Sequence, residues 1–340
     1  MRKQSTGMQK TVTYKQIIKL PISLLVGFLL IYLWLRFIDV SEMFRILKKI
    51  SLFWVLVSAF LYLFAYYIRS LRWKIILEPV EVVGNKEVFH LFMAGMLVNY
   101  IIPIRAGEIA KAFFLKSLKG TYVSRSLPTI FIDKMMDLFP IILLIILLPV
   151  VPIKLNPIIV FLLCSLLIIF LLFLIIIWLA IRKSHSVTLT LQKFFFWLPK
   201  KLKERVHQFI ALFVEGLAVI QKNKKEIHLI FFLTILALLL DTLYIIIMFK
   251  AFGFKLPFLI GLFGYGLVNL SYILPTPPAQ IGSNEAIYII IFTFAFGIEK
   301  NLVSAALGFA HLLTGTLIFL AGIYALNRLN IGLQKAFAVH

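Results

Sequence analysis

Charged residues and cysteine are scarce in this 340-residue chain. Charged residues make up only 14% of it and hydrophobic residues 62%, whereas soluble globular proteins have about 25% charged and about 45–50% apolar residues. The single cysteine, Cys164, lies in an apolar run and can form no internal disulfide. This composition excludes an ordinary cytosolic enzyme and a disordered protein, and it favours a chain whose main solvent is lipid.

The motifs of nucleotide, metal and hydrolase chemistry are missing as well. The chain has no Gly-x-x-x-x-Gly-Lys-Ser/Thr loop, no Gly-x-Ser-x-Gly elbow and no Asp-x-Asp pair. Its six histidines are scattered, and no clustered His and Cys set offers a metal site. We therefore expect no cofactor and no metal. The sequence leans against an enzyme but does not decide the point.

Long hydrophobic runs dominate what the sequence does contain. The runs are continuous and lack strand-like alternation, so they predict an all-α, polytopic membrane protein rather than a β-barrel. Strong spans are expected at 17–35, 50–68, 138–152, 158–181, 229–249 and 302–325. Weaker segments, interrupted by glycine or proline, lie at 90–104, 258–274 and 286–296. Together they predict about eight spans.

Basic residues set the expected orientation. Lys and Arg outnumber Asp and Glu by 35 to 14 and lie between the apolar runs, so the expected partner is an anionic membrane surface and not nucleic acid. The positive-inside rule places the N-terminus, segment 105–137 and segment 182–228 in the cytoplasm. We expect a cell (inner or plasma) membrane protein with both termini cytoplasmic and a retained first span. The basic loop 36–49, expected outside, conflicts with this rule.

Two membrane halves are expected on either side of a basic connection. The predicted organisation is an N-terminus at 1–16, a first half at 17–181, a connection at 182–228, a second half at 229–328 and a tail at 329–340. The connection contains a basic amphipathic helix, which either lies on the inner leaflet or helps to capture substrate. Arg69, Arg72 and Trp73 end the second span and are expected to anchor it at the inner surface.

Two of the interrupted segments resemble each other. A Leu-Val-Asn triplet ends at Asn99 and again at Asn269, 170 residues later, and each is followed by proline, glycine and glutamate. Such paired interruptions point to a transport site near the midplane, because the next helix presents free N–H groups to a wet cavity. A proline kink without a ligand is the alternative. The positions are Pro103, Gly107 and Glu108, then Pro275, Pro278, Gly282 and Glu285.

Charged residues near these breaks complete the candidate site. Arg105 and Lys111 would hold a phosphate, and Glu108 and Glu285 would gate transport or exchange a proton. Asp133 and Asp137, expected to open the span at 138–152, belong either to the site or to an interfacial ion cluster. The expected substrate-binding set is Asn99, Pro103, Arg105, Gly107, Glu108, Lys111, Asp133, Lys134, Asp137, Asn269, Pro275, Pro278, Gly282 and Glu285.

Two further polar residues lie within apolar runs. Asp241 is either functional, or part of a buried structural pair, or a protonated acid, since a charge at mid-depth is costly. His311 shares a helix face with Gly308, Gly315 and Gly322, which recur every seven residues. That spacing favours a core histidine on a closely packed helix.

The motifs resemble a known family. Asn99 to Glu108 reads Asn-Tyr-Ile-Ile-Pro-Ile-Arg-Ala-Gly-Glu and follows Tyr-Ile-Arg-Ser-Leu-Arg-Trp at 67–73. Both resemble the flippase-like membrane domain of lysylphosphatidylglycerol synthases, over about residues 15–328. In that family the second motif has a Gly-Gly pair, where Ala279 and Gln280 stand here, so we expect a local change in backbone or substrate. The resemblance implies movement of a charged lipid between leaflets. It does not imply aminoacyl transfer, which the fused enzymes carry in a soluble domain.

The function predicted from the sequence is passive or ion-coupled translocation of a charged lipid, either a phospholipid or a polyprenyl-phosphate-linked sugar. The first alternative is a membrane-embedded transferase in lipid-linked sugar or aminoacyl-phosphatidylglycerol synthesis. The second is a partner subunit that recruits a glycosyltransferase or another lipid-modifying enzyme. The sequence also leaves open whether the protein forms a homodimer.

Overall fold

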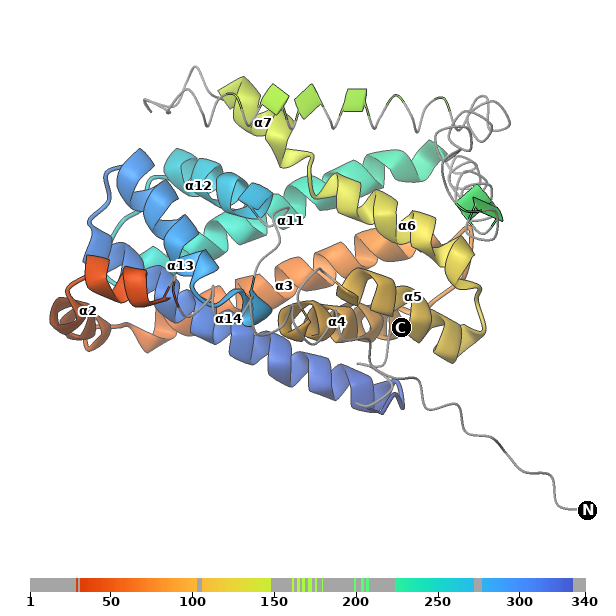
Figure 1. The fold of residues 1–340 in the computed structure, drawn as a ribbon, viewed down its shortest axis with the longest axis horizontal. Coiled ribbons are helices and arrows are strands. Elements are labelled where there is room, and N and C mark those ends of the chain that lie inside the picture. The colour runs from red at the N-terminus through yellow and green to blue at the C-terminus, as the bar shows by residue number, and fades with distance from the viewer. Residues whose placement is uncertain are drawn as a thin grey trace, which may run out of the picture.

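The computed structural model describes residues 29, 31–102, 106–147, 224–271 and 277–332, with isolated positions between 161 and 207. Every regular element in these ranges is helical and none is a strand, which confirms the predicted all-α class. Figure 1 shows long helices that cross one another with shorter helices packed on them.

Within the described residues, three helices are long and apolar enough to cross a membrane: α3 (Leu52–Leu77), α11 (Lys224–Ala251) and α14 (Lys300–Arg328). They correspond to the predicted spans at 50–68, 229–249 and 302–325. Part of the predicted span at 138–152 forms α7 (Pro140–Leu147). Most residues of the predicted spans at 17–35 and 158–181 lie outside the described residues.

Helices α3 and α11 pack antiparallel along their lengths, although they come from opposite ends of the sequence (Figure 1). At one end, the backbone N–H of Ser51 donates to the carbonyl of Ala251 over 2.9 Å. At the other end, Arg72 reaches Thr234. Two small residues, Ala65 and Ala237, are buried between the helices and let them approach closely. This pair is the centre on which the other helices assemble.

Both predicted interruptions are present. Helix α4 (Asn85–Ile101) ends before the break, and α5 (Ala106–Lys119) begins after it. In the second motif, α12 (Phe258–Ser271) precedes a 3₁₀ turn, η1 (Pro278–Gln280), and then α13 (Ser283–Tyr288). At 1.5 Å per residue, α4 and α12 are about 25 and 21 Å long, shorter than the roughly 30 Å hydrocarbon core. Turn η1 packs against α4, so the two interrupted segments meet.

The charged segment 105–137 differs from its prediction. It forms α5 and α6 (Val123–Met136), each with a buried face. Asp137 caps the C-terminus of α6, so Asp133, Lys134 and Asp137 end this helix rather than opening the following span. The physical reason is that apolar residues such as Phe114 and Ile130 recur at helical spacing between the charges and are buried.

Helix α14 uses two of its three seam glycines to approach α4. A Cβ atom on Gly315 would overlap the ring of Tyr100, and one on Gly322 would lie 2.5 Å from the Cβ of Leu97. At Gly308 the nearest atom, in Trp34, is 3.7 Å away, which is an ordinary contact.

The remaining described elements are a π-helical turn, η2 (Ile289–Ala295), which continues α13, and α2 (Val40–Leu47), which packs on α14.

The glycine seam predicts a difference between two matched substitutions. Gly322→Ala should lower the free energy of unfolding by about 1–3 kcal/mol, because the added methyl group overpacks the contact with Leu97. Gly308→Ala has room and should leave stability unchanged or raise it, since alanine favours a helix. Thermal unfolding of the detergent-solubilised protein measures both. Equal unfolding midpoints for the two variants would contradict the role assigned to the seam.

Candidate functional site

Two arginines on α3 point into the bundle instead of anchoring its end at the surface. The side chain of Arg72 is only 1% exposed. Its Nε donates to Asp133 Oδ1 over 2.8 Å, and its Nη2 donates to Asp137 Oδ1 over 2.7 Å. The prediction of a surface anchor was wrong for Arg72 and Trp73, both of which are buried. A buried arginine needs ionic partners, and α6 supplies them.

Arg69 joins the two halves of the chain. Its guanidinium forms an ion pair with Asp241 of α11 and donates to the hydroxyl of Tyr265 of α12 over 3.1 Å. Its Nε also lies 3.8 Å from Asp137 Oδ1. Asp241 is buried, and Arg69 is its ionic partner.

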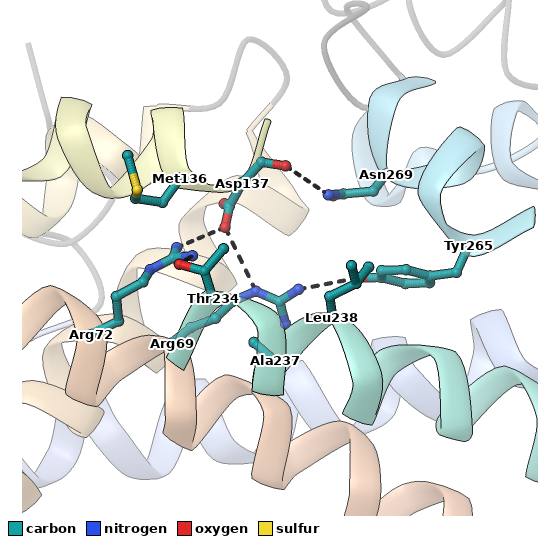
Figure 2. Close-up of a pocket in the computed structure, with 9 residues that line it drawn as sticks. All are labelled: Arg69, Arg72, Met136, Asp137, Thr234, Ala237, Leu238, Tyr265 and Asn269. Carbon is teal, nitrogen blue, oxygen red and sulfur yellow. Dashed lines mark hydrogen bonds and ion pairs between the residues drawn. The ribbon is translucent and has the colours of Figure 1, made fainter. Parts of the chain in front are cut away.

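These residues line a small pocket between α3, α6, α11 and α12. Figure 2 shows Arg69 and Arg72 directed toward Asp137 from one side, while Asn269 approaches it from α12. The amide of Asn269 donates to the backbone carbonyl of Asp137 over 3.1 Å. The free space in this pocket is about that of one water molecule, far less than the roughly 300–1,000 Å³ of a typical ligand site. In this conformation the pocket is too small for a ligand of ordinary size.

Glu108 extends the charged cluster toward α5. Lys111 Nζ lies 2.6 Å from Glu108 Oε2, and Lys134 Nζ lies 3.1 Å from Glu108 Oε1. Lys134 also lies 3.1 Å from Asp137 Oδ2. Burial alone would raise the pKa of Glu108, but Lys111 and Lys134 overcome this effect and lower the pKa to about 2. Glu108 therefore keeps its charge at neutral pH.

The cluster is electrically balanced. It contains four basic and four acidic side chains, drawn from both halves of the chain. Because each charge has an oppositely charged partner, the cost of burying it is offset. We call this set the ion network; its members are Arg69, Arg72, Lys111, Lys134, Glu108, Asp133, Asp137 and Asp241.

Asn99 bridges the first break. Its side-chain oxygen accepts the backbone N–H of Gly107 over 2.7 Å, and its amide nitrogen donates to Glu108 over 3.1 Å. A Cβ on Gly107 would overlap the carbonyl oxygen of Gly95, so only glycine allows α4 and α5 to come this close. Asn99 thus satisfies a free N–H group at the start of α5.

The second break has a different arrangement. Glu285 Oε2 accepts the backbone N–H of Gly282 over 2.8 Å, and Oε1 lies 2.6 Å from His311 Nδ1. His311 Nε2 lies 2.8 Å from the carbonyl oxygen of Ala279. His311 is buried and both of its ring nitrogens have a partner, one of which is the glutamate of the second motif. Ala279 and Gln280 have φ angles of 52° and 57°, so they keep a left-handed backbone that glycine favours.

These positions account for most of the predicted site. The structure brings seven predicted residues into or against the ion network: Glu108, Lys111, Asp133, Lys134, Asp137, Asn269 and Asp241. The predicted residues Pro278, Gly282, Glu285 and His311 lie together at the second break. Pro103, Arg105 and Pro275 lie outside the described residues.

The prediction missed Arg69, Arg72 and Tyr265 as members of the site. The signal available in the sequence was the three-residue spacing of two arginines on an apolar helix, which puts both on one face. Asp241, alone in another apolar run, indicated that a basic partner was needed.

The family comparison agrees with this geometry. The model of the lysylphosphatidylglycerol synthase TM region matches residues 17–322, a range that includes both breaks and the whole ion network. The chain belongs to this family. The resemblance found in the sequence motifs is thereby confirmed.

Two curated relatives are archaeal membrane proteins. A UPF0104 membrane protein of Methanothermobacter thermautotrophicus is 22% identical over 294 residues, which cover 82% of this chain and 86% of that protein. A UPF0104 membrane protein of Methanocaldococcus jannaschii is 24% identical over 304 residues, covering 85% and 89%. No solved structure matches significantly. This member of the lysylphosphatidylglycerol synthase TM family is a membrane protein.

The ion network predicts how this family member responds to losing one buried charge. Arg72→Met should lower the free energy of unfolding by about 3–5 kcal/mol, because Asp133 is left buried without its cation. Adding Asp133→Asn should recover part of this loss. Denaturant unfolding in mixed micelles measures the difference.

Arg45→Met is the matched control. Arg45 pairs with Glu42 over 2.7 Å, but its side chain is 71% exposed, so its removal should leave the unfolding midpoint unchanged. A double variant that is less stable than Arg72→Met alone would show that Asp133 does not depend on Arg72.

Proposed function

We propose that this protein translocates a phosphate-bearing lipid between the two leaflets of a cell membrane. The observation that supports the proposal most is the ion network, which lies between helices of both halves and beside the first break. Charged side chains among membrane helices are costly, and they commonly mark the path of a polar substrate. Paired interruptions in two parts of a transporter favour the same assignment.

The proposed mechanism is an exchange of anions. The carboxylate of Asp137 forms ion pairs with three cations: Arg69, Arg72 and Lys134. A lipid phosphate carries the same sign of charge and also accepts several hydrogen bonds, so it can replace this carboxylate. Because the network is neutral without lipid, an added phosphate must displace one of its anions rather than fill an empty basic site.

Lys134 is the cation best placed to meet the headgroup first. Its side chain is 27% exposed, whereas that of Lys111 is 3% exposed. Lys111 Nζ also lies 4.5 Å and 5.0 Å from the ring centroids of Phe92 and Trp73. We therefore assign the phosphate contact to Lys134, together with Arg105. Lys111 holds Glu108 in place.

Opening of the pocket is the required motion. The headgroup enters when α12 separates from the α3–α11 pair, since Tyr265 and Asn269 of α12 cover the arginines. The basic segments at 105–137 and 182–228 support a cytoplasmic position for these parts of the chain. The network would then open toward the inner leaflet.

Lys134→Gln tests the proposal in proteoliposomes that contain fluorescent phosphatidylglycerol. Loss of a charge-assisted hydrogen bond of about 1.5–3 kcal/mol should slow translocation about tenfold or more. Lys119→Gln is the matched control, because Lys119 forms an ion pair with Glu87 at the surface of α5. The rate of dithionite quenching measures leaflet exchange.

Two results would contradict the proposal. Equal rates for the wild type, Lys134→Gln and protein-free vesicles would show that the protein does not translocate this class of lipid. A chemically new lipid formed from a labelled donor would instead support the transferase alternative. Chromatography of the lipids recovered from the same vesicles distinguishes these outcomes.

A further inference from the structure

We propose that Glu285, His311 and the carbonyl of Ala279 form a proton-binding site that couples lipid translocation to proton movement. This inference rests on the proposed translocation and names its coupling ion. It depends on the geometry of the second break, where a glutamate and a histidine meet inside the protein. Their side chains are 11% and 7% exposed.

The hydrogen-bond geometry fixes the number of protons. The carbonyl oxygen of Ala279 can only accept, so His311 Nε2 must carry a hydrogen and donate it over 2.8 Å. The other ring nitrogen lies 2.6 Å from Glu285 Oε1. Two lone pairs repel each other at that distance, so one proton lies between Nδ1 and Oε1. The pair is either imidazolium with carboxylate or imidazole with carboxylic acid, and both forms hold the same proton.

The surroundings leave the pair without another counter-ion among the described residues. From α4, the titratable group that faces His311 is Tyr100, whose ring centroid is 6.3 Å away. From η1 and α13, Gln280 and Asn284 bond to each other over 2.9 Å and are uncharged. Asp241 of α11, Asn301 of α14 and His90 of α4 have partners of their own.

Those partners lie at other levels of the helices. On α11, Asp241 pairs with Arg69. Helix α2 approaches α14 near Asn301, and His90 of α4 stacks on Tyr324 near the other end of α14. Retention of the proton therefore depends on the Glu285–His311 contact itself.

The first break provides the contrast. Glu108 occupies the position that corresponds to Glu285, but its partners are Lys111 and Lys134. Lysine stays charged near neutral pH, whereas the protonation of histidine changes there. Of the two glutamates predicted to exchange a proton, the contacts support Glu285 and assign Glu108 a permanent charge.

The bound proton also stabilises a strained turn. Ala279 and Gln280 both have positive φ angles, which are unfavourable for a residue that is not glycine. His311 secures this turn through the carbonyl of Ala279, and Glu285 secures the start of α13 through Gly282. When the proton leaves, the imidazole keeps one N–H, so His311 can donate either to Glu285 or to the carbonyl of Ala279, but not to both. Turn η1, which packs on α4, is then free to relax toward the first break.

A pH gradient across proteoliposomes tests the coupling. Vesicles with wild-type protein and fluorescent phosphatidylglycerol are given a pH difference of about one unit, and a potassium ionophore holds the membrane potential at zero. One proton per lipid corresponds to about a tenfold ratio of lipid between the leaflets at steady state. Glu285→Gln and His311→Gln should exchange lipid but reach a ratio near one.

Thr314→Val is the matched control. Thr314 lies one turn from His311 on α14, and its hydroxyl donates to the backbone carbonyl of that residue over 3.1 Å. This variant should keep the tenfold ratio. The coupling is overturned if the wild type translocates lipid to a ratio near one, or if Glu285→Gln keeps the gradient-driven ratio; both results leave translocation itself intact.

Infrared titration of the protein in lipid separates proton binding from transport. The wild type and Thr314→Val should show one joint transition of the carboxyl and imidazole bands, which both Glu285→Gln and His311→Gln abolish. If the wild type translocates no lipid, the proposed function fails, and this titration still decides the proton site. Identical titrations for the wild type and the two site variants would overturn the proton site directly.

Discussion

The contact between Arg69 and Asp241 is the constraint on which the arrangement of the site depends. It ties α3 of the first part of the chain to α11 of the second, and the same guanidinium reaches Tyr265 and Asp137. An arginine buried without such partners would be strongly destabilising. Four helices must therefore keep one another's charges in place. Separation of any one of them exposes charges that a headgroup can satisfy.

The two interrupted segments share one sequence pattern, but the groups that hold their glutamates differ in charge. In each, an asparagine precedes the break and a glutamate lies in the first turn of the next helix. Glu108 is held by two lysines, so the first break keeps fixed charges suited to a phosphate. Glu285 is held by one histidine, so the second break depends on a proton. In the proposed mechanism, the first break provides the substrate contact and the second break provides the coupling contact.

Local signals in the sequence predicted the helices and the breaks between them, but not which side chains pair with one another. Hydropathy located α3, α11 and α14, and the repeated Leu-Val-Asn, proline, glycine and glutamate pattern located both breaks. The burial of Arg72 was missed, because basic residues near the end of an apolar span usually lie at the membrane surface. Its partner Asp133 is 61 residues away, and only the packing of α6 on α3 brings them together. The pairing of Glu285 with His311 likewise required the crossing of α13 and α14.

An experimental structure of the protein in lipid nanodiscs with bound phosphatidylglycerol tests the central claim most directly. The account predicts headgroup density within hydrogen-bonding distance of Lys134, with Asp137 displaced from at least one arginine and α12 moved away from α3. A structure with phosphatidylglycerol bound only at the outer surface of the helices, and with every contact of the ion network intact, would contradict it.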